Sequence, residues 1–154
     1  MGYTHYWYTK GNVTPEVWSK ITEGIEKIIA ATPKVEIKRE YNSISPPLIN
    51  NQEVVFNGVG DLGHETFCLN REQQPTPKWQ TTTNPLGTFA FCKTARKPYD
   101  LLVCSTLLIA KCYADDVFTL ASDGEWGRDW EQAKKLVDEE LDIKFLVCPF
   151  RGGE

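Results

Sequence analysis

The segment from Leu101 to Cys112 is apolar on nearly every side of a helix, which limits the possible folds more than any other feature of this chain. Pro98 precedes it, and proline suits the first turn of a helix because its missing N–H would have no partner there. A helix that is apolar all around is buried. The run is far shorter than the ~18 apolar residues that span a bilayer. We therefore predict a buried central helix over residues 98–114.

Two amphipathic helices are expected beside it. Thr14 and Pro15 form a typical helix start, and apolar residues then recur at helical spacing as far as Thr32 and Pro33. Asp129 with Gln132 resembles a capping pair and predicts the start of a third helix. Each of these helices has one apolar face, so each is expected to cover another element.

Strands are predicted wherever apolar and polar residues alternate or β-branched and aromatic residues gather. The expected strands are residues 2–8, 35–40, 53–57, 65–71, 88–92, 117–121 and 143–148. Residues 42–52 and 72–88 are expected to be loops, the second long enough to be mobile or functional. Strands and helices are mixed along the chain, so we predict an α+β fold. It is a single domain over residues 1–150, with a mostly antiparallel sheet, about three helices and a frayed tail at 151–154.

Composition limits the partners. The chain has 154 residues and a net charge of −4, which argues against binding long nucleic acids, because proteins that do so are usually basic. No signal peptide or membrane span is predicted. The chain has 5 cysteines, an odd number, and no two of them form a C-x-x-C pair. Most lie in apolar runs, which predicts free thiols in a reducing cytosol. The acidic segment 115–125 fits no calcium-loop spacing, so no metal site and no cofactor are predicted.

Lys93, Arg96 and Lys97 lie just before the predicted central helix. Cations are disfavoured at a helix N-terminus, which already carries partial positive charge, unless an anion binds there. The cluster therefore predicts a phosphate site. The alternative is a solvated basic turn that pairs with Asp100 or with the acidic segment 115–142.

The N-terminus is rich in aromatic residues. On a strand, Tyr3, His5 and Trp7 share one face, and Thr4, Tyr6 and Tyr8 share the other. One face must meet the core, which accounts for most of these rings, and the other can stack on a base.

The second histidine, His64, lies in a His-Glu-Thr sequence. Two such elements would allow a phosphodiesterase mechanism, with His5 and His64 as base and acid, but the element around His5 is incomplete.

Several blocks together resemble a family of small proteins from tailed phages and bacterial genomes. They are Met-Gly-Tyr-Thr-His-Tyr at 1–6, Asn-Gly at 57–58, His-Glu-Thr-Phe at 64–67, Phe-Cys-Lys-Thr-Ala-Arg-Lys-Pro-Tyr-Asp at 91–100 and Ser-Asp-Gly at 122–124. The resemblance covers nearly the whole chain except the loop 72–88. Small phage proteins of this size include sponges that sequester nucleotide-derived immune signals, so the resemblance implies an anti-defence role by analogy.

We therefore predict a protein of the host bacterial cytoplasm that binds a small phosphorylated nucleotide, of the cyclic ADP-ribose or cyclic oligonucleotide type, without cleaving it. It is expected to be a homo-oligomer. The alternatives are a cyclic nucleotide phosphodiesterase that uses His5 and His64, and an inhibitor that binds a host enzyme. The expected ligand-binding residues are Tyr3, His5, Tyr6, Asn57, His64, Glu65, Phe67, Lys93, Thr94, Arg96, Lys97, Tyr99 and Asp123.

Overall fold

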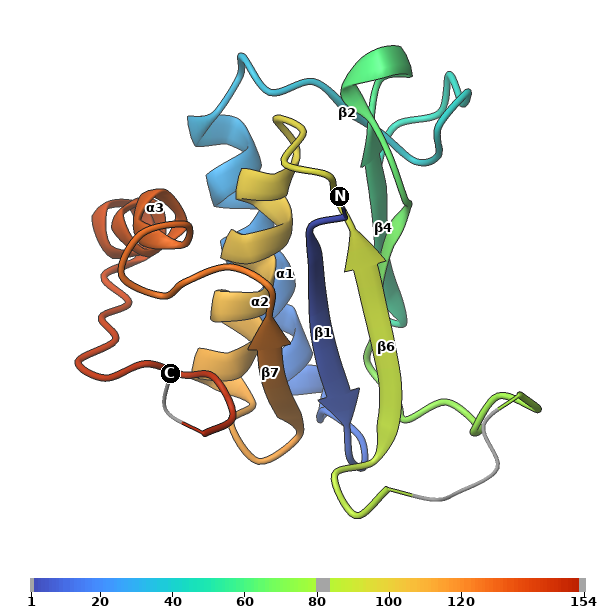
Figure 1. The fold of residues 1–154 in the computed structure, drawn as a ribbon, viewed down its shortest axis with the longest axis vertical. Helices are drawn as coiled ribbons and strands as arrows, with labels where there is room; N and C mark the ends of the chain where they lie inside the picture. The colour runs from blue at the N-terminus through green and yellow to red at the C-terminus, as the bar shows by residue number, and fades with distance from the viewer. Residues whose placement is uncertain (1, 80–83, 153–154) are drawn as a thin grey trace.

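The central helix is present. In the computed structural model, which describes residues 2–79 and 84–152, α2 spans Asp100–Tyr113, and every residue from Leu102 to Ala110 is buried. It packs between α1 (Pro15–Ala31) and α3 (Glu131–Leu141) and also contacts strand β7 (Phe118–Ser122). Figure 1 shows α1 and α2 side by side, with α3 beyond α2. The prediction of three helices, one of them buried, is confirmed.

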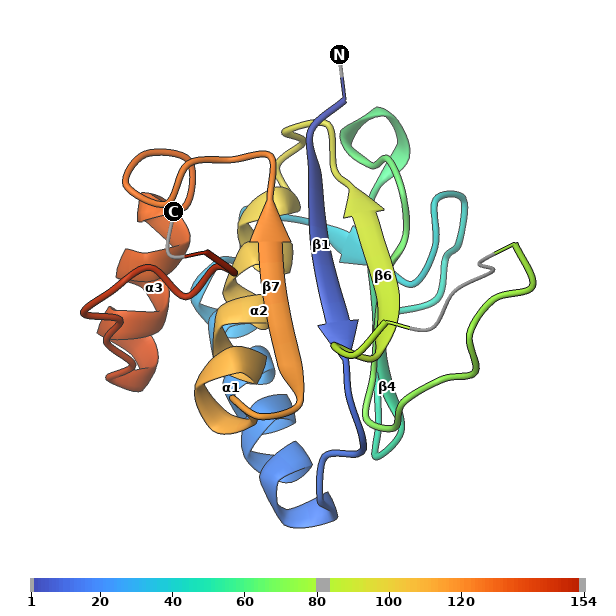
Figure 2. The same ribbon diagram turned by 60° about the horizontal axis from the view of Figure 1, so that its bottom comes forward.

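The strand that matters most for the site is β1 (Thr4–Thr9), the middle strand of an antiparallel sheet. Its neighbours are β6 (Thr88–Lys93) and β7, with His5 opposite Cys92 on one side and opposite Ser122 on the other. His5 and Trp7 are buried, whereas Tyr6 and Tyr8 are only partly covered. The predicted alternation therefore holds from His5 to Tyr8, whereas Thr4, which was expected to share the face of Tyr6, is buried. In Figure 2 the helices α1 and α2 lie behind this sheet.

The remaining strands form a second antiparallel sheet around β4 (Glu53–Gly58). Its other members are β2 (Ile37–Lys38), β3 (Leu48–Ile49) and β5 (Phe67–Asn70), and the short 3-10 helix η1 (Gly60–Leu62) follows β4. The ring of Phe67 contacts that of Trp7, with centroids 5.2 Å apart, so the two sheets share one core. The fold is α+β with two antiparallel sheets, so the predicted fold class is confirmed.

The start of α1 is as predicted. The Thr14 hydroxyl accepts the N–H of Val17, and Pro15 occupies the first turn. The predicted cap of α3 is wrong. Trp130 is the N-cap residue and makes no side-chain cap, because the Asp129 carboxylate instead accepts the N–H of Glu125 and pairs with Arg96.

The strand predicted at 143–148 is absent. Leu146 and Val147 are exposed, and the chain instead meets β7 one step later, where Phe150 bridges Leu120. The edge of β7 thus meets the segment after the apolar run and not the run itself. Two smaller differences are that β2 covers only two residues of the predicted 35–40 strand, and that β3 lies within the predicted loop 42–52. Of the predicted tail, residues 153–154 lie outside the described part of the chain.

Shortening a core side chain of α1 is expected to cost much more stability than shortening a surface one. Ile25 is fully buried, so Ile25→Ala should lower the free energy of unfolding by about 2–5 kcal/mol. Glu23→Ala on the exposed side of the same helix should change it by less than about 0.5 kcal/mol. Urea unfolding followed by circular dichroism measures both; equal effects would contradict the packing of α1.

Candidate functional site

The turn between β6 and α2 has an unusual backbone. Ala95 and Arg96 both have left-handed φ angles, 52° and 60°, although neither is glycine. The N–H groups of Thr94 and Ala95 both donate to the carbonyl oxygen of Tyr3, at 3.1 and 3.3 Å, which ties the turn to the start of β1. Such backbone conformations cost free energy and persist where surrounding structure holds them, often at functional sites. The turn therefore fixes the direction in which the Arg96 side chain leaves the backbone.

Arg96 lies over an aromatic ring. Its guanidinium carbon is 3.9 Å from the ring centroid of Tyr3, and its Nη1 donates to Asp129 Oδ1 at 2.9 Å. A guanidinium on a phenol face is held by both electrostatic attraction and stacking. Asp129 holds it from the side of α3. Arg96 is thus oriented by two elements that lie far apart in the sequence.

A cavity of about 240 Å³ lies next to this arginine. Its walls come from the start of β1, the β6–α2 turn, the first turns of α2 and the start of α3. The lining residues are Tyr3, Arg96, Lys97, Pro98, Asp100, Leu101, Cys104, Asp129, Gln132 and Ala133. A larger hollow of about 740 Å³ beside Trp126 and Phe150 has only Glu125 and Arg151 as charged groups. Charged and hydrogen-bonding groups converge in the smaller cavity, which makes it the candidate site.

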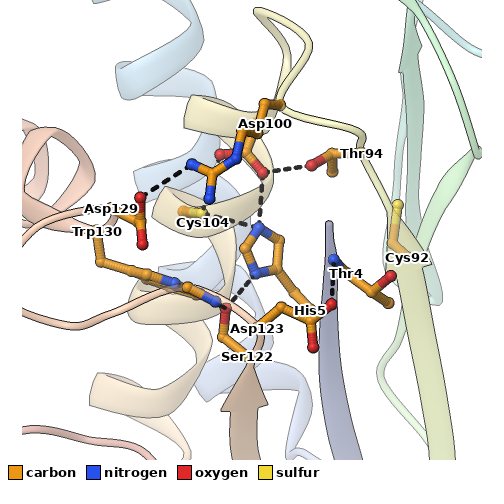
Figure 3. Close-up of polar contacts among 12 residues, drawn as sticks. Thr4, His5, Cys92, Thr94, Asp100, Cys104, Ser122, Asp123, Asp129 and Trp130 are labelled. Atoms are coloured by element: carbon orange, nitrogen blue, oxygen red, sulfur yellow. Dashed lines mark hydrogen bonds and ion pairs between the residues drawn. The ribbon is translucent and has the colours of Figure 1, made fainter. Parts of the chain in front are cut away.

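Behind the cavity lies a buried histidine with both ring nitrogens engaged (Figure 3). His5 Nδ1 lies 2.7 Å from Ser122 Oγ, and His5 Nε2 lies 2.6 Å from Asp100 Oδ1. Ser122 Oγ already accepts the N–H of Gly124 and the indole N–H of Trp130, at 2.8 and 3.0 Å. Both of its lone pairs are therefore used, so its proton donates to His5 Nδ1. Because Nδ1 accepts this hydrogen bond, the proton of His5 lies on Nε2, and the Nε2–H group donates to Asp100.

The carboxylate of Asp100 accepts hydrogen bonds from several side chains. Besides His5, it accepts the hydroxyl of Thr94 at 2.5 Å, and its second oxygen lies 3.6 Å from the sulfur of Cys104. Asp100 is in the first turn of α2, where the helix dipole favours a negative charge. The anion that the sequence predicted at this helix start is thus supplied, at least in part, by the protein itself.

Burial and charge shift the pKa values of the surrounding groups. Burial and then the charge of Asp100 raise the pKa of the Cys104 thiol well above its usual value, so the sulfur is protonated at neutral pH. The same two causes raise the pKa of Tyr3. The backbone N–H of Glu125, followed by Arg96, lowers the pKa of Asp129, which is therefore ionised. The cavity consequently holds two carboxylates, one paired guanidinium and Lys97.

The structure brings together five of the predicted site residues. Tyr3, Arg96 and Lys97 line the cavity, and His5 and Thr94 lie in the hydrogen-bonded network behind it. His5 is fully buried, and it contacts three residues that line the cavity: Asp100, Cys104 and, through its ring, Tyr3.

The other predicted residues lie elsewhere. Asn57, Phe67 and Tyr99 are fully buried, and Asn57 bonds the backbone around His64. The Glu65 carboxylate accepts the backbone N–H of Lys93. Tyr6 donates to Asp123 on the open side of the first sheet. The remaining two, His64 and Lys93, are not among the lining residues of the cavity.

Four groups of the site were missed from the sequence: Cys104, Ser122, Asp129 and Gln132. Asp100 was weighed only as a charge partner of the basic turn. The spacing of Asp100 and Cys104, four residues apart on one helix, places them on the same face and was a usable signal. Nothing local points to Ser122, because only strand pairing brings it opposite His5.

No family model, curated protein or solved structure matches this chain. Within the described residues, none of the helices is both long and apolar enough to cross a membrane.

The position of Tyr3 can be tested through a glycine. A Cβ atom on Gly124 would collide with the hydroxyl of Tyr3 and touch Asp129, whereas a Cβ on Gly127 would meet no described atom within 4 Å. Gly124→Ala should therefore lower the free energy of unfolding by about 1–3 kcal/mol, the usual cost of overpacking. Gly127→Ala, in the same loop, should change it by less than about 0.5 kcal/mol. Thermal unfolding of both variants decides the matter; a harmless Gly124→Ala would mean that Tyr3 does not occupy this place.

Proposed function

We propose that this protein binds a small phosphorylated nucleotide in the cavity beside Tyr3 and Arg96 and keeps it intact. The observation that carries this proposal is the orientation of Arg96 at the cavity wall. Its left-handed backbone, shared with Ala95, sets where the side chain starts, and the Tyr3 ring supports the guanidinium. Arginine binds phosphate oxygens through two parallel hydrogen bonds, and a pre-oriented guanidinium loses less entropy on binding.

Phosphate recognition would use the donors of Arg96 that Asp129 leaves free. Asp129 engages Nη1, and a guanidinium has five N–H donors. Lys97 lines the same cavity and, among the described residues, forms no ion pair, so its ammonium group is available to a second phosphate oxygen. The Gln132 amide can donate or accept hydrogen bonds with ribose hydroxyl groups, and the Asp129 carboxylate can accept them.

The size of the cavity limits the ligand. Its volume of about 240 Å³ lies a little below the ~300 Å³ at which pockets for drug-sized ligands begin. We therefore expect it to hold one ribose phosphate or one base, with the rest of the ligand extending over the exposed Arg96.

The chemistry of the network favours binding over cleavage. His5 is fully buried, its Nδ1 accepts the Ser122 hydroxyl and its Nε2 donates to Asp100, so neither ring nitrogen is free to take a proton from a ligand in the cavity. Cys104 is a protonated thiol and a poor nucleophile. These features weigh against the phosphodiesterase alternative, which needs His5 as base or acid.

The biological setting of the proposal comes from the resemblance of the 91–100 block to proteins of tailed phages and bacteria. In that setting the ligand is an immune signal of the cyclic ADP-ribose or cyclic oligonucleotide type, and the protein acts in the host cytoplasm. Retaining such a ligand is easier when protomers bury it between them, so homo-oligomerisation belongs to the same proposal. Light scattering coupled to size-exclusion chromatography measures it.

Binding is tested by thermal shift and calorimetry with cyclic ADP-ribose isomers and cyclic dinucleotides. A ligand should raise the melting temperature of the wild type, because ligands that bind only the native state stabilise it. Arg96→Ala should weaken binding roughly 10–100-fold, since a hydrogen bond to a charged group contributes about 1.5–3 kcal/mol. Lys135→Ala is the matched control, because Lys135 is an exposed cation of α3 away from the cavity.

The fate of the ligand separates the alternatives. After incubation, heat denaturation and chromatography, intact nucleotide supports sequestration, whereas a linearised product would support the phosphodiesterase. If none of these ligands shifts the melting temperature of the wild type, the nucleotide proposal fails and inhibition of a host enzyme becomes the better hypothesis.

A further inference from the structure

The network behind the cavity contains three different metal-ligating groups. His5 Nε2, a carboxylate oxygen of Asp100 and Cys104 Sγ lie within 4.8 Å of one another. They come from β1 and from two successive turns of α2, so the packing of the first sheet against this helix, through β7, holds them in place. We propose that they form a zinc site whose fourth position opens into the cavity.

The spacing of these atoms is close to that of a tetrahedral site. Around zinc, with bonds of about 2.0–2.3 Å, ligand atoms lie roughly 3.3–3.7 Å apart. Cys104 Sγ lies 3.3 Å from His5 Nε2 and 3.6 Å from Asp100 Oδ2. These two distances make Oδ2 the carboxylate oxygen placed to bind the metal. The hydrogen bond from His5 Nε2 goes to the other oxygen, Oδ1, at 2.6 Å, and it is lost when a metal replaces the proton on Nε2.

The chemistry of the donors selects the metal. One imidazole, one carboxylate and one thiolate is a set that borderline-soft Zn²⁺ accepts, whereas Mg²⁺ and Ca²⁺ prefer oxygen ligands alone. Three protein ligands with one open position are typical of zinc sites that bind water or a further ligand. Here the open position faces a cavity, because Asp100 and Cys104 line it together with Tyr3 and Gln132.

The charges balance as well. Binding displaces one proton, that of the Cys104 thiol, so the thiolate, the Asp100 carboxylate and Zn²⁺ together carry no net charge. A neutral centre is the form that a buried site tolerates best, because an isolated ion is costly to bury. The imidazole keeps its proton, which moves from Nε2 to Nδ1.

Ser122 makes this change observable. With a proton on Nδ1, the Ser122 oxygen faces three N–H donors and has two lone pairs. The longest of its present bonds, at 3.0 Å, is the one from the indole of Trp130. We therefore expect zinc to weaken that bond and to shift the indole N–H resonance of Trp130.

The test uses zinc alone, without nucleotide, so that its outcome is independent of the proposed function. Protein stripped with a chelator should bind one equivalent of Zn²⁺ in a competition titration. Cys104→Ala should weaken binding by at least about 100-fold, since even partners beyond the ligands contribute roughly 10–100-fold. Cys112→Ser removes an exposed thiol and should bind as the wild type does. Equal affinity in Cys104→Ala, or no stoichiometric binding by the wild type, overturns the proposal.

Two measurements on intact sites cover the case in which Cys104→Ala does not fold. Co²⁺ added to Cys112→Ser should give a thiolate charge-transfer band and the strong visible absorption of tetrahedral cobalt. Zinc should move the Trp130 indole resonance in the same protein. A spectrum without the thiolate band, or binding that leaves Trp130 unchanged, shows that the metal binds elsewhere and overturns the proposal.

Discussion

A buried histidine needs a hydrogen-bond partner for each ring nitrogen, and much of this structure depends on how His5 obtains both. Its Nε2 reaches Asp100 on α2, and its Nδ1 reaches Ser122 on β7. Ser122 in turn accepts the indole N–H of Trp130, which precedes α3. One ring therefore links the first strand, the last strand and two helices, and an error in the register of any of them would leave a buried polar group without a partner, at a cost of about 1–3 kcal/mol.

The same network gives the cavity its character. Asp100 lies at the N-terminus of α2 and accepts the Thr94 hydroxyl, which places its side chain next to a protonated thiol at the cavity wall. In the same cavity wall, Asp129 and the Tyr3 ring hold Arg96. The proposed phosphate contacts use the arginine and the lysine of the cavity, whereas the proposed zinc site uses the histidine, the carboxylate and the thiol of the network. The two sets share no group, so each proposal can hold without the other.

Sequence reasoning succeeded where the signal was local. The apolar residues of α2 and the Thr14–Pro15 start of α1 are properties of a single segment, so they could be recognised without a partner. It failed where two segments compete for one partner. The run 143–148 has the composition of a strand, yet the edge of β7 pairs with Phe150 instead. Asp129 looks like a helix cap, yet it is used by Arg96 and by a turn amide.

The sequence by itself determined that this chain forms an α+β domain around one buried helix, and that a cluster of cations precedes that helix. Both conclusions rest on hydrophobic periodicity and on the order of charges, which act over a few residues. Only the tertiary structure decided that Arg96 pairs with Asp129, that Asp100 bonds His5, and that His5 lies beside Cys104. These contacts join residues about 30 to 100 positions apart. None of them is therefore defined until the strand register and the helix packing have formed.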